Sequence, residues 1–322
     1  MDLMDLSAYL RRLDSLEAPD EALVRWLWDY QRGCNPVLRE YAERLGAEGP
    51  VSLPVAFFKH FSLQSGTWEP ELVFESSGTT GQTPSRHLVR DAQLYARTAL
   101  QGFFRFFPRH PRRILALLPS YLERGQSSLV QMVKDWMDAF GLPGSGFCLY
   151  HTELLRQSVA EAADAGEPVL LIGVAYALLD LVEEQAMPLP PGAMVLETGG
   201  MKGRREELTR EELHARLRAG LGVPHVYSEY GMTELMSQAY LLPDGRFHPA
   251  PTMQVRISDI HLDRLDQPPG VTGRIHVTDL ANVHSCAFIA TDDLGRLYPD
   301  GSFDVLGRLD TAELRGCNLM YV

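Results

Sequence analysis

The sequence predicts an α/β protein in which a parallel sheet layered with helices is joined to a smaller antiparallel β subdomain. In the first two thirds of the chain, short apolar segments alternate with helix-like segments. A strand, a helical crossover and another strand favour a parallel sheet with helices on both faces. After about residue 225 the segments become short and partly alternating, with Gly, Pro and Asp turns between them, which indicates antiparallel pairing.

The elements follow in order along the chain. Charged residues and leucines alternate near the N-terminus and predict amphipathic helices over residues 4–17, 21–31 and 36–46. Apolar runs predict the strands 71–76, 113–119, 168–173 and 193–198. Helix-like segments lie between and after these strands, over residues 91–106, 126–140, 152–165, 175–186 and 206–220.

Composition indicates a globular protein and excludes several partners. The 322 residues are 45% hydrophobic, which is enough for a sizeable core, and the net charge is −12. Such an acidic surface repels nucleic acid and anionic lipid. No apolar run approaches the roughly 18 residues of a membrane span, and the acidic N-terminus does not resemble a signal peptide. We therefore expect a cytoplasmic protein.

The cysteines predict neither disulfides nor a metal centre. Cys34, Cys148, Cys286 and Cys317 are widely separated, and none has the spacing of a zinc site. In a reducing compartment we expect all four to be free thiols and no structural metal to be bound.

A loop rich in Gly, Ser and Thr, residues 76–81 (SSGTTG), follows the apolar run 72–74. Glycines let backbone N–H groups approach phosphate oxygens, and hydroxyl groups add further donors. The spacing is not that of a Walker A loop. Taken alone, the pattern fits a surface turn as well as a phosphate-binding loop.

Three later stretches favour the second interpretation. They are YSEYGMTE (227–234), TDDLG (291–295), with paired carboxylates suited to ribose hydroxyls, and GRLD (307–310). In this order, the four stretches resemble the core motifs of the acyl-adenylating superfamily, which includes acyl-CoA ligases, firefly-type luciferases and peptide-synthetase adenylation domains. The resemblance implies ATP and Mg²⁺ as cofactors.

A narrower resemblance rests on residues 117–133, 197–214 and 227–240. These look like the acyl-protein synthetases of the LuxE type, the fatty-acid-activating component of a fatty acid reductase complex, and the chain is more distantly similar to phenylacetate-CoA ligases. The resemblance implies an acid–thiol ligase that makes an acyl-adenylate from a carboxylic acid, a fatty acid in this family. It also implies a reductase as protein partner.

The resemblance assigns roles by position. Ser76, Ser77, Gly78, Thr79, Thr80 and Gly81 match the phosphate loop, in which Arg86 replaces the usual lysine as the nearby cation. Gly199 and Gly200 match the backbone that lies beside adenine, and Tyr230 and Gly231 match the aromatic turn that packs on the adenine face. Thr233 matches the residue whose hydroxyl faces the α-phosphate, and Glu234 matches the Mg²⁺ ligand. Asp293, with Arg308 beside it, matches the ribose carboxylate, although Asp292 leaves the choice between the two aspartates open.

Each of these residues has a plainer structural interpretation when it is taken singly. Tyr230 fits a core aromatic, and Glu234 and Asp293 fit solvated charges at loop ends. The chemistry of adenylation favours these residues as a group. The carboxylate and ATP are both anions, so Mg²⁺ and backbone N–H groups must neutralise charge. Holding the two reactants in line also removes much of the entropic barrier.

The C-terminal stretch departs from the superfamily pattern. Superfamily members usually continue into a mobile C-terminal domain, whereas twelve residues follow Asp310 in this sequence. We therefore expect an acyl-adenylating domain over 1–310, with its β-rich part at 225–307, and a short tail over 311–322. In LuxE-type proteins the tail cysteine accepts the acyl group, which implies that Cys317 is the catalytic nucleophile, with Arg315 favouring its thiolate.

Two other functions remain open at this point. One is an acyl- or aryl-CoA ligase that is completed by a separate C-terminal domain. The other is a non-catalytic adenylate-binding scaffold for a reductase. The missing lysines favour it, and the intact phosphate-loop and YGMTE stretches and the tail residue Cys317 oppose it.

Overall fold

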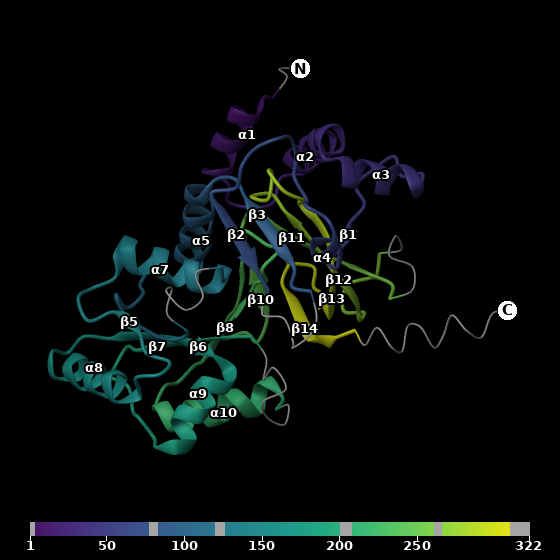
Figure 1. Ribbon diagram of the computed structural model, residues 1–322. Coiled ribbons are helices and arrows are strands. Elements are labelled where there is room, and N and C mark those ends of the chain that lie inside the picture. Colours follow the sequence, from purple (N-terminus) through teal and green to yellow (C-terminus); the bar gives the residue numbers. More distant parts are fainter. Residues whose placement is uncertain (1–3, 77–82, 120–125, 200–207, 261–265, 310–322) are drawn as a thin grey trace. The chain divides into compact units, whose positions relative to one another are not determined.

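The computed structural model describes residues 4–76, 83–119, 126–199, 208–260 and 266–309. The chain divides into two compact units (Figure 1). Unit 1 combines Met1–Thr67 with Phe247–Val322, and unit 2 is the continuous stretch Trp68–Arg246. The first and last parts of the chain therefore belong to one unit.

Unit 2 is built on a mainly parallel sheet. In spatial order its strands are β5 (Gly146–Phe147), β4 (Arg113–Leu117), β6 (Val169–Val174), β7 (Met194–Thr198), β8 (Tyr227–Tyr230) and β9 (Ala239–Leu241). The strands from β5 to β8 are parallel to their neighbours, and β9 runs antiparallel to β8. Every residue of β6 and β7 is buried, as a sheet covered on both faces requires.

Helices cover both faces of this sheet (Figure 1). On one side lie α5 (Ala92–Phe106) and α7 (Ser128–Phe140), and on the other lie α8 (Thr152–Asp164), α9 (Ala175–Glu184) and α10 (Arg210–Leu221). The predicted α/β class with a parallel sheet is confirmed. Five predicted helices and three predicted strands coincide with these elements to within a few residues.

Local sequence signals set the helix ends. The Asp91 carboxylate accepts from the Leu94 N–H at the start of α5, and Ser127 does the same for Val130 at α7. At α10, Thr209 and Glu212 form a reciprocal capping box, and the helix ends at Gly222 with a left-handed φ of 66°.

The strand predicted over 71–76 does not join the parallel sheet. It forms β2 (Leu72–Glu75), which pairs antiparallel with β3 (Arg86–Val89) in a separate two-stranded sheet. β3 follows β2 closely in the sequence, so it can pair with β2 in place of the parallel strands that lie further along the chain. β3 was not predicted because its four residues, RHLV, show little apolar periodicity.

Unit 1 is built on an antiparallel sheet. Its strands follow the spatial order β11 (Met253–Ser258), β12 (Gly273–Asp279), β13 (Phe288–Leu297), β14 (Phe303–Arg308) and β10 (Phe247–Pro249), and β1 (Leu53–Pro54) pairs parallel with β13. The expected antiparallel part is therefore present. Among its described residues, the helices are α1 (Leu6–Leu13), α2 (Glu21–Cys34), α3 (Pro36–Arg44) and α4 (Phe57–His60).

A buried glutamine attaches the N-terminal helices to this sheet. Gln31 on α2 is fully buried, and its Nε2 donates to the backbone carbonyls of Asn282 and Val283 at 2.9 and 3.0 Å. Its Oε1 accepts from the Ala287 N–H at 3.0 Å. The Asn35 side chain, which also caps α3, donates to the Ser285 carbonyl. Side chains of α2 and of the cap of α3 thus hydrogen-bond to one short segment before β13.

Gln31→Met should destabilise the protein strongly, because it keeps the volume but leaves buried backbone groups without partners. Each unpaired buried group costs about 1–3 kcal/mol, so we expect a loss of at least about 3 kcal/mol in the free energy of unfolding. Chemical denaturation measures this loss. Gln157→Met on the exposed side of α8 is the matched control, expected to change stability by less than about 0.5 kcal/mol; equal losses in the two variants would contradict the role of Gln31.

Candidate functional site

The phosphate-loop prediction falls mostly outside the described residues. Ser77, Gly78, Thr79, Thr80 and Gly81 lie there, and only Ser76 is described. Its N–H donates to the Ser85 carbonyl, and its hydroxyl accepts from the Ser85 N–H at 2.9 Å. These two bonds close the base of the β2–β3 connection. Arg86, the expected substitute cation, lies 3.3 Å from the Glu75 carboxylate.

A buried histidine joins this hairpin to the predicted aromatic turn. His87 on β3 is 1% exposed, and its Nδ1 donates to the Thr233 carbonyl at 2.8 Å. Thr233 stands in the turn after β8, between Tyr230 at the strand end and Glu234, which are both buried. Two stretches separated by 146 positions in the sequence therefore meet within unit 2.

The predicted adenine-side residues stand at the carboxyl ends of adjacent parallel strands. Gly199 follows β7 and Tyr230 ends β8, where ligands of open α/β sheets usually bind. Gly199 has a φ of +71°, and a Cβ there would meet no atom of the described residues within 4 Å. Gly200 lies outside the described residues.

Four polar side chains at these strand ends were not predicted. Thr198 Oγ1 donates to Glu229 Oε2 at 2.5 Å, and the Ser228 hydroxyl donates to Glu197 Oε1. His214 on α10 places its Nε2 3.3 Å from the same Glu197 oxygen. Because neighbouring residues of a strand face opposite sides, the two glutamates form two separate polar groups, one on each face of the sheet.

Burial sets the protonation of Glu229. Desolvation, with a smaller contribution from the negative charge of Glu197, raises the pKa of Glu229 to about 7, although the Thr198 hydrogen bond opposes the shift. A Cβ at position 231 would lie 2.2 Å from Glu229 Oε1, so Gly231 is required to admit the carboxyl group. The string YSEYGMTE contained the signal for Glu229: a charged residue in an otherwise buried strand.

The predicted ribose carboxylate belongs to unit 1. Asp293 on β13 and Arg308 on β14 are cross-strand partners, with Arg308 Nε 3.4 Å from Asp293 Oδ1. The Asp293 side chain is 11% exposed, and its backbone N–H donates to the Thr291 hydroxyl. The Asp292 carboxylate instead lies 3.4 Å from Arg274. The two aspartates thus have different cationic partners.

Within the described residues, only isolated carboxylates are available as Mg²⁺ ligands, and no set of several protein ligands surrounds one position. No group of three or more His, Cys, Asp or Glu side chains among them is arranged to hold a metal ion. Mg²⁺ is commonly held by one or two carboxylates together with substrate phosphates. Glu234, the predicted Mg²⁺ ligand, is a buried carboxylate, and its role stays a prediction.

Burial disfavours the thiolate form of the described cysteines. Cys34, Cys148 and Cys286 are free, and burial raises the pKa of each thiol, that of Cys286 to about 12. Since the thiolate is the nucleophile, such groups react slowly at neutral pH. Cys317, the predicted nucleophile, lies outside the described residues.

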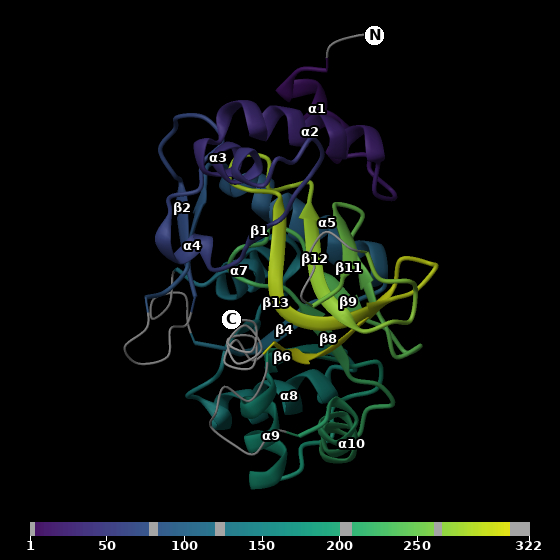
Figure 2. The same cartoon turned by 90° about the vertical axis from the view of Figure 1, so that its right-hand side faces the viewer.

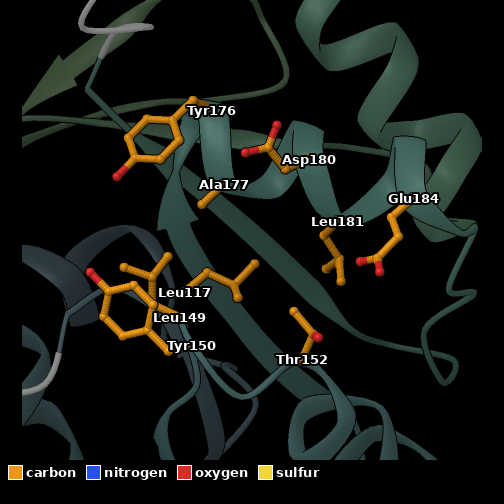
Figure 3. Close-up of a pocket in the computed structure, with 9 residues that line it drawn as sticks. All are labelled: Leu117, Leu149, Tyr150, Thr152, Tyr176, Ala177, Asp180, Leu181 and Glu184. Carbon is orange, nitrogen blue, oxygen red and sulfur yellow. The ribbon is translucent and has the colours of Figure 1, made fainter. Parts of the chain in front are cut away.

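Unit 2 also contains a pocket that the sequence did not indicate (Figure 3). It lies at the carboxyl end of β4 beside one face of α9 and has a volume of about 220 Å³. Its lining is Leu117, Leu149, Tyr150, Thr152, Tyr176, Ala177, Asp180, Leu181 and Glu184.

The Glu229→Gln variant should lose part of the pH dependence of stability. The folded-state pKa of Glu229, about 7, exceeds the ordinary glutamate value of 4.5, so the folded protein holds the proton longer and stability falls as pH rises from about 4.5 to 7. Gln cannot ionise and mimics the protonated acid. We expect the variant to match wild type near pH 4 and to be more stable than wild type at pH 7 and above in thermal unfolding. Glu211→Gln, on the exposed side of α10, should follow wild type; parallel curves for Glu229→Gln would refute the assignment.

Comparisons with known proteins give the fold. No family model and no curated protein matches the sequence. Among solved structures, ATP-bound MatB from Rhodopseudomonas palustris is similar with a TM-score of 0.54 and 18% identity, over 75% of this chain and 49% of that one.

A second similar structure is O-succinylbenzoate coenzyme A synthetase (MenE) from Bacillus subtilis. Its AMP complex has a TM-score of 0.50 and 20% identity, over 77% of this chain and 50% of that one. Its complex with ATP and magnesium has a TM-score of 0.50 and 21% identity, over 73% and 49%. The chain therefore has the α/β fold of these proteins and spans about half of their length.

Proposed function

We propose that the chain activates a carboxylic acid with ATP and Mg²⁺ to form an acyl-adenylate. The contact of His87 with the Thr233 carbonyl carries the proposal. It fastens the strand that follows the phosphate-loop sequence to the turn that contains Tyr230 and Glu234. The shared fold with proteins solved in complex with ATP and with AMP supports this assignment.

In this proposal each part of the site acts by position and charge. The backbone N–H groups and hydroxyls of residues 76–81 hold the phosphates, with Thr79 and Thr80 as the central donors. Tyr230 packs on adenine, Gly199 and Gly200 leave room beside it, and Asp293 with Arg308 holds ribose. Mg²⁺ neutralises the charge of the phosphates, and Glu234 is the carboxylate that holds it.

The reaction makes chemical sense with these groups. A carboxylate is a poor acyl donor because its leaving group is oxide, whereas the leaving group of an acyl-adenylate is a phosphate. Attack of the acid on the α-phosphate releases pyrophosphate, and Thr233 stabilises the charge that develops there. No nucleophile from the protein takes part in this step.

We further propose that the activated acid is a fatty acid and that its acyl group passes to Cys317 and then to a reductase. The resemblance to LuxE-type proteins supports this finer assignment. The thiolate attacks the acyl carbonyl carbon, a thioester forms, and AMP leaves with the bonding electrons. Among the four cysteines, Cys34, Cys148 and Cys286 have pKa values raised by burial, which leaves Cys317 as the candidate acceptor.

An acyl- or aryl-CoA ligase is the second candidate. The likeness to MenE, a coenzyme A synthetase, favours it. The two functions share the adenylation step and differ in the thiol that receives the acyl group.

The Glu234→Gln variant should make acyl-adenylate about a hundredfold more slowly, because it removes the charge that Mg²⁺ requires while keeping the size. Pyrophosphate release with ATP and a panel of fatty acids measures the rate, and the Mg²⁺ concentration for half-maximal activity should rise. Glu211→Gln is the control with unchanged kinetics. An unchanged Mg²⁺ titration in Glu234→Gln would show that the residue has a structural role only.

The Cys317→Ser variant should still release pyrophosphate but should hold no hydroxylamine-labile acyl group. Intact-protein mass spectrometry after incubation with ATP, Mg²⁺ and a fatty acid detects the thioester. Cys34→Ser, which changes a half-buried thiol, should keep it. Mapping of the acyl group to Cys34, Cys148 or Cys286 would overturn the assignment, and transfer to added coenzyme A alone would favour the second candidate.

A further inference from the structure

Strand β13 has a bulge at the position of the predicted ribose carboxylate. β13 lies beside β12 in the antiparallel sheet of unit 1 (Figure 2). Arg274 on β12 pairs with Leu294, whereas His276 pairs with Ala290. A single β12 residue is therefore opposed by three β13 residues, 291–293. Bulges are frequent next to active sites, where they change the direction of a side chain.

Side chains supply hydrogen bonds inside this bulge. Thr291 is fully buried, and its hydroxyl donates to the Ile275 carbonyl at 2.9 Å and accepts from the Asp293 N–H at 3.1 Å. The Thr291 carbonyl accepts from Arg274 Nε at 2.7 Å. Buried backbone groups need partners wherever the ladder of a sheet is interrupted. Arg274 and the Thr291 hydroxyl provide these partners here.

Arg274 also contacts the next residue of the bulge. Its Nη2 lies 3.4 Å from Asp292 Oδ1, and the Arg274 side chain is only 14% exposed. The Asp292 carbonyl accepts from the Leu309 N–H at 2.7 Å, just beyond β14. A planar guanidinium can donate to a carbonyl and a carboxylate at once, which a lysine ammonium does less well. Arg274 thus holds both the backbone and a side chain of the bulge.

The bulge determines which of the two aspartates faces which arginine. Asp292 lies beside Arg274 of β12, whereas Asp293 lies beside Arg308 of β14. Successive side chains of a strand alternate in direction, so a slip of one residue in the bulge would exchange the two carboxylates. The contacts of Arg274 oppose such a slip, because they hold Thr291 and Asp292 in their present places.

We propose that Arg274 is a positioning residue for nucleotide binding, which fixes the bulge 291–293 so that Asp293, and not Asp292, meets the ribose hydroxyls. This inference rests on the proposed function, in which Asp293 holds ribose. Arg274 touches no nucleotide and acts through the Thr291 carbonyl and the Asp292 carboxylate. Hydroxyl groups donate strongly to an ionised carboxylate, but only when it is correctly placed.

The test compares two nucleotides that differ only at the ribose: ATP and 2′,3′-dideoxy-ATP, which lacks both hydroxyls. Calorimetric titration of the full chain with each nucleotide, in the presence of Mg²⁺ and without an acid substrate, gives dissociation constants. We expect wild type to bind ATP about tenfold or more tightly than the dideoxy nucleotide. Asp293→Asn should lose most of this preference. Asp292→Asn, whose amide oxygen still accepts from Arg274, should keep it.

The Arg274→Gln variant should reduce the preference to about twofold or less, because affinity for ATP falls while affinity for the dideoxy nucleotide stays the same. A residue that merely supports the fold would weaken both nucleotides alike. Arg274→Lys, which keeps the charge but not the planar group, should show an intermediate preference. Arg296→Gln is the matched control with an unchanged preference, since Arg296 is exposed on the same strand and donates to the Thr272 hydroxyl outside the bulge.

Hydrogen exchange of the wild-type protein tests the bulge without any variant or nucleotide. The amides of Asp293 and Leu309, which donate to the Thr291 hydroxyl and the Asp292 carbonyl, should be protected. Rapid exchange of both amides would overturn the bulge. A full ATP preference in both Arg274 variants, together with its loss in Asp293→Asn, would overturn the positioning role and leave the proposed function intact. Equal binding of the two nucleotides by wild type would overturn the ribose contact of the proposed function and this inference with it.

Discussion

Burial of the parallel strands on both faces is the constraint on which unit 2 depends. Side chains of β6 and β7 cannot reach water, so their sequences are almost entirely apolar until the last residues. Where polar residues enter, at Glu197 and Thr198, each must find a partner on its own face. Glu197 receives the Ser228 hydroxyl, and Thr198 donates to Glu229. The polar groups thus concentrate at the carboxyl ends, where the chain turns toward the candidate site.

The class and most elements of unit 2 were predictable because hydrophobic periodicity reports burial directly. The runs at 113–119, 168–173 and 193–198 are continuous and apolar, and the helices between them are amphipathic. Which strands pair with one another was less predictable, because an apolar run does not indicate which strand lies beside it in the sheet. The strand 71–76 therefore looked like another parallel strand, whereas its real partner is the short β3. The attachment of the first helices to the last strands in unit 1 has no local signal at all.

For the candidate site, the sequence motifs name the positions that we propose as nucleotide contacts, but they do not indicate the groups that hold those positions in place. Gly199 and Tyr230 stand at adjacent strand ends, and Asp293 faces Arg308 across a strand pair. His87 was missed because a single histidine in a short strand is more often a core residue, and its partner is a backbone carbonyl that any residue would supply. Long-range backbone contacts of this kind leave no trace in composition or spacing.

The Gln31 contact has a consequence for the order in which the chain folds during synthesis. Residues 31 and 282 are separated by 251 positions, and unit 2 is made entirely between them. At about 5–20 residues per second, the ribosome takes roughly 13–50 s to cover that distance. All strands of unit 2 are therefore synthesised before the backbone groups that pair with Gln31 on α2. Chaperones that bind nascent chains therefore have a window of tens of seconds on these N-terminal helices, which closes only when the segment before β13 leaves the ribosome.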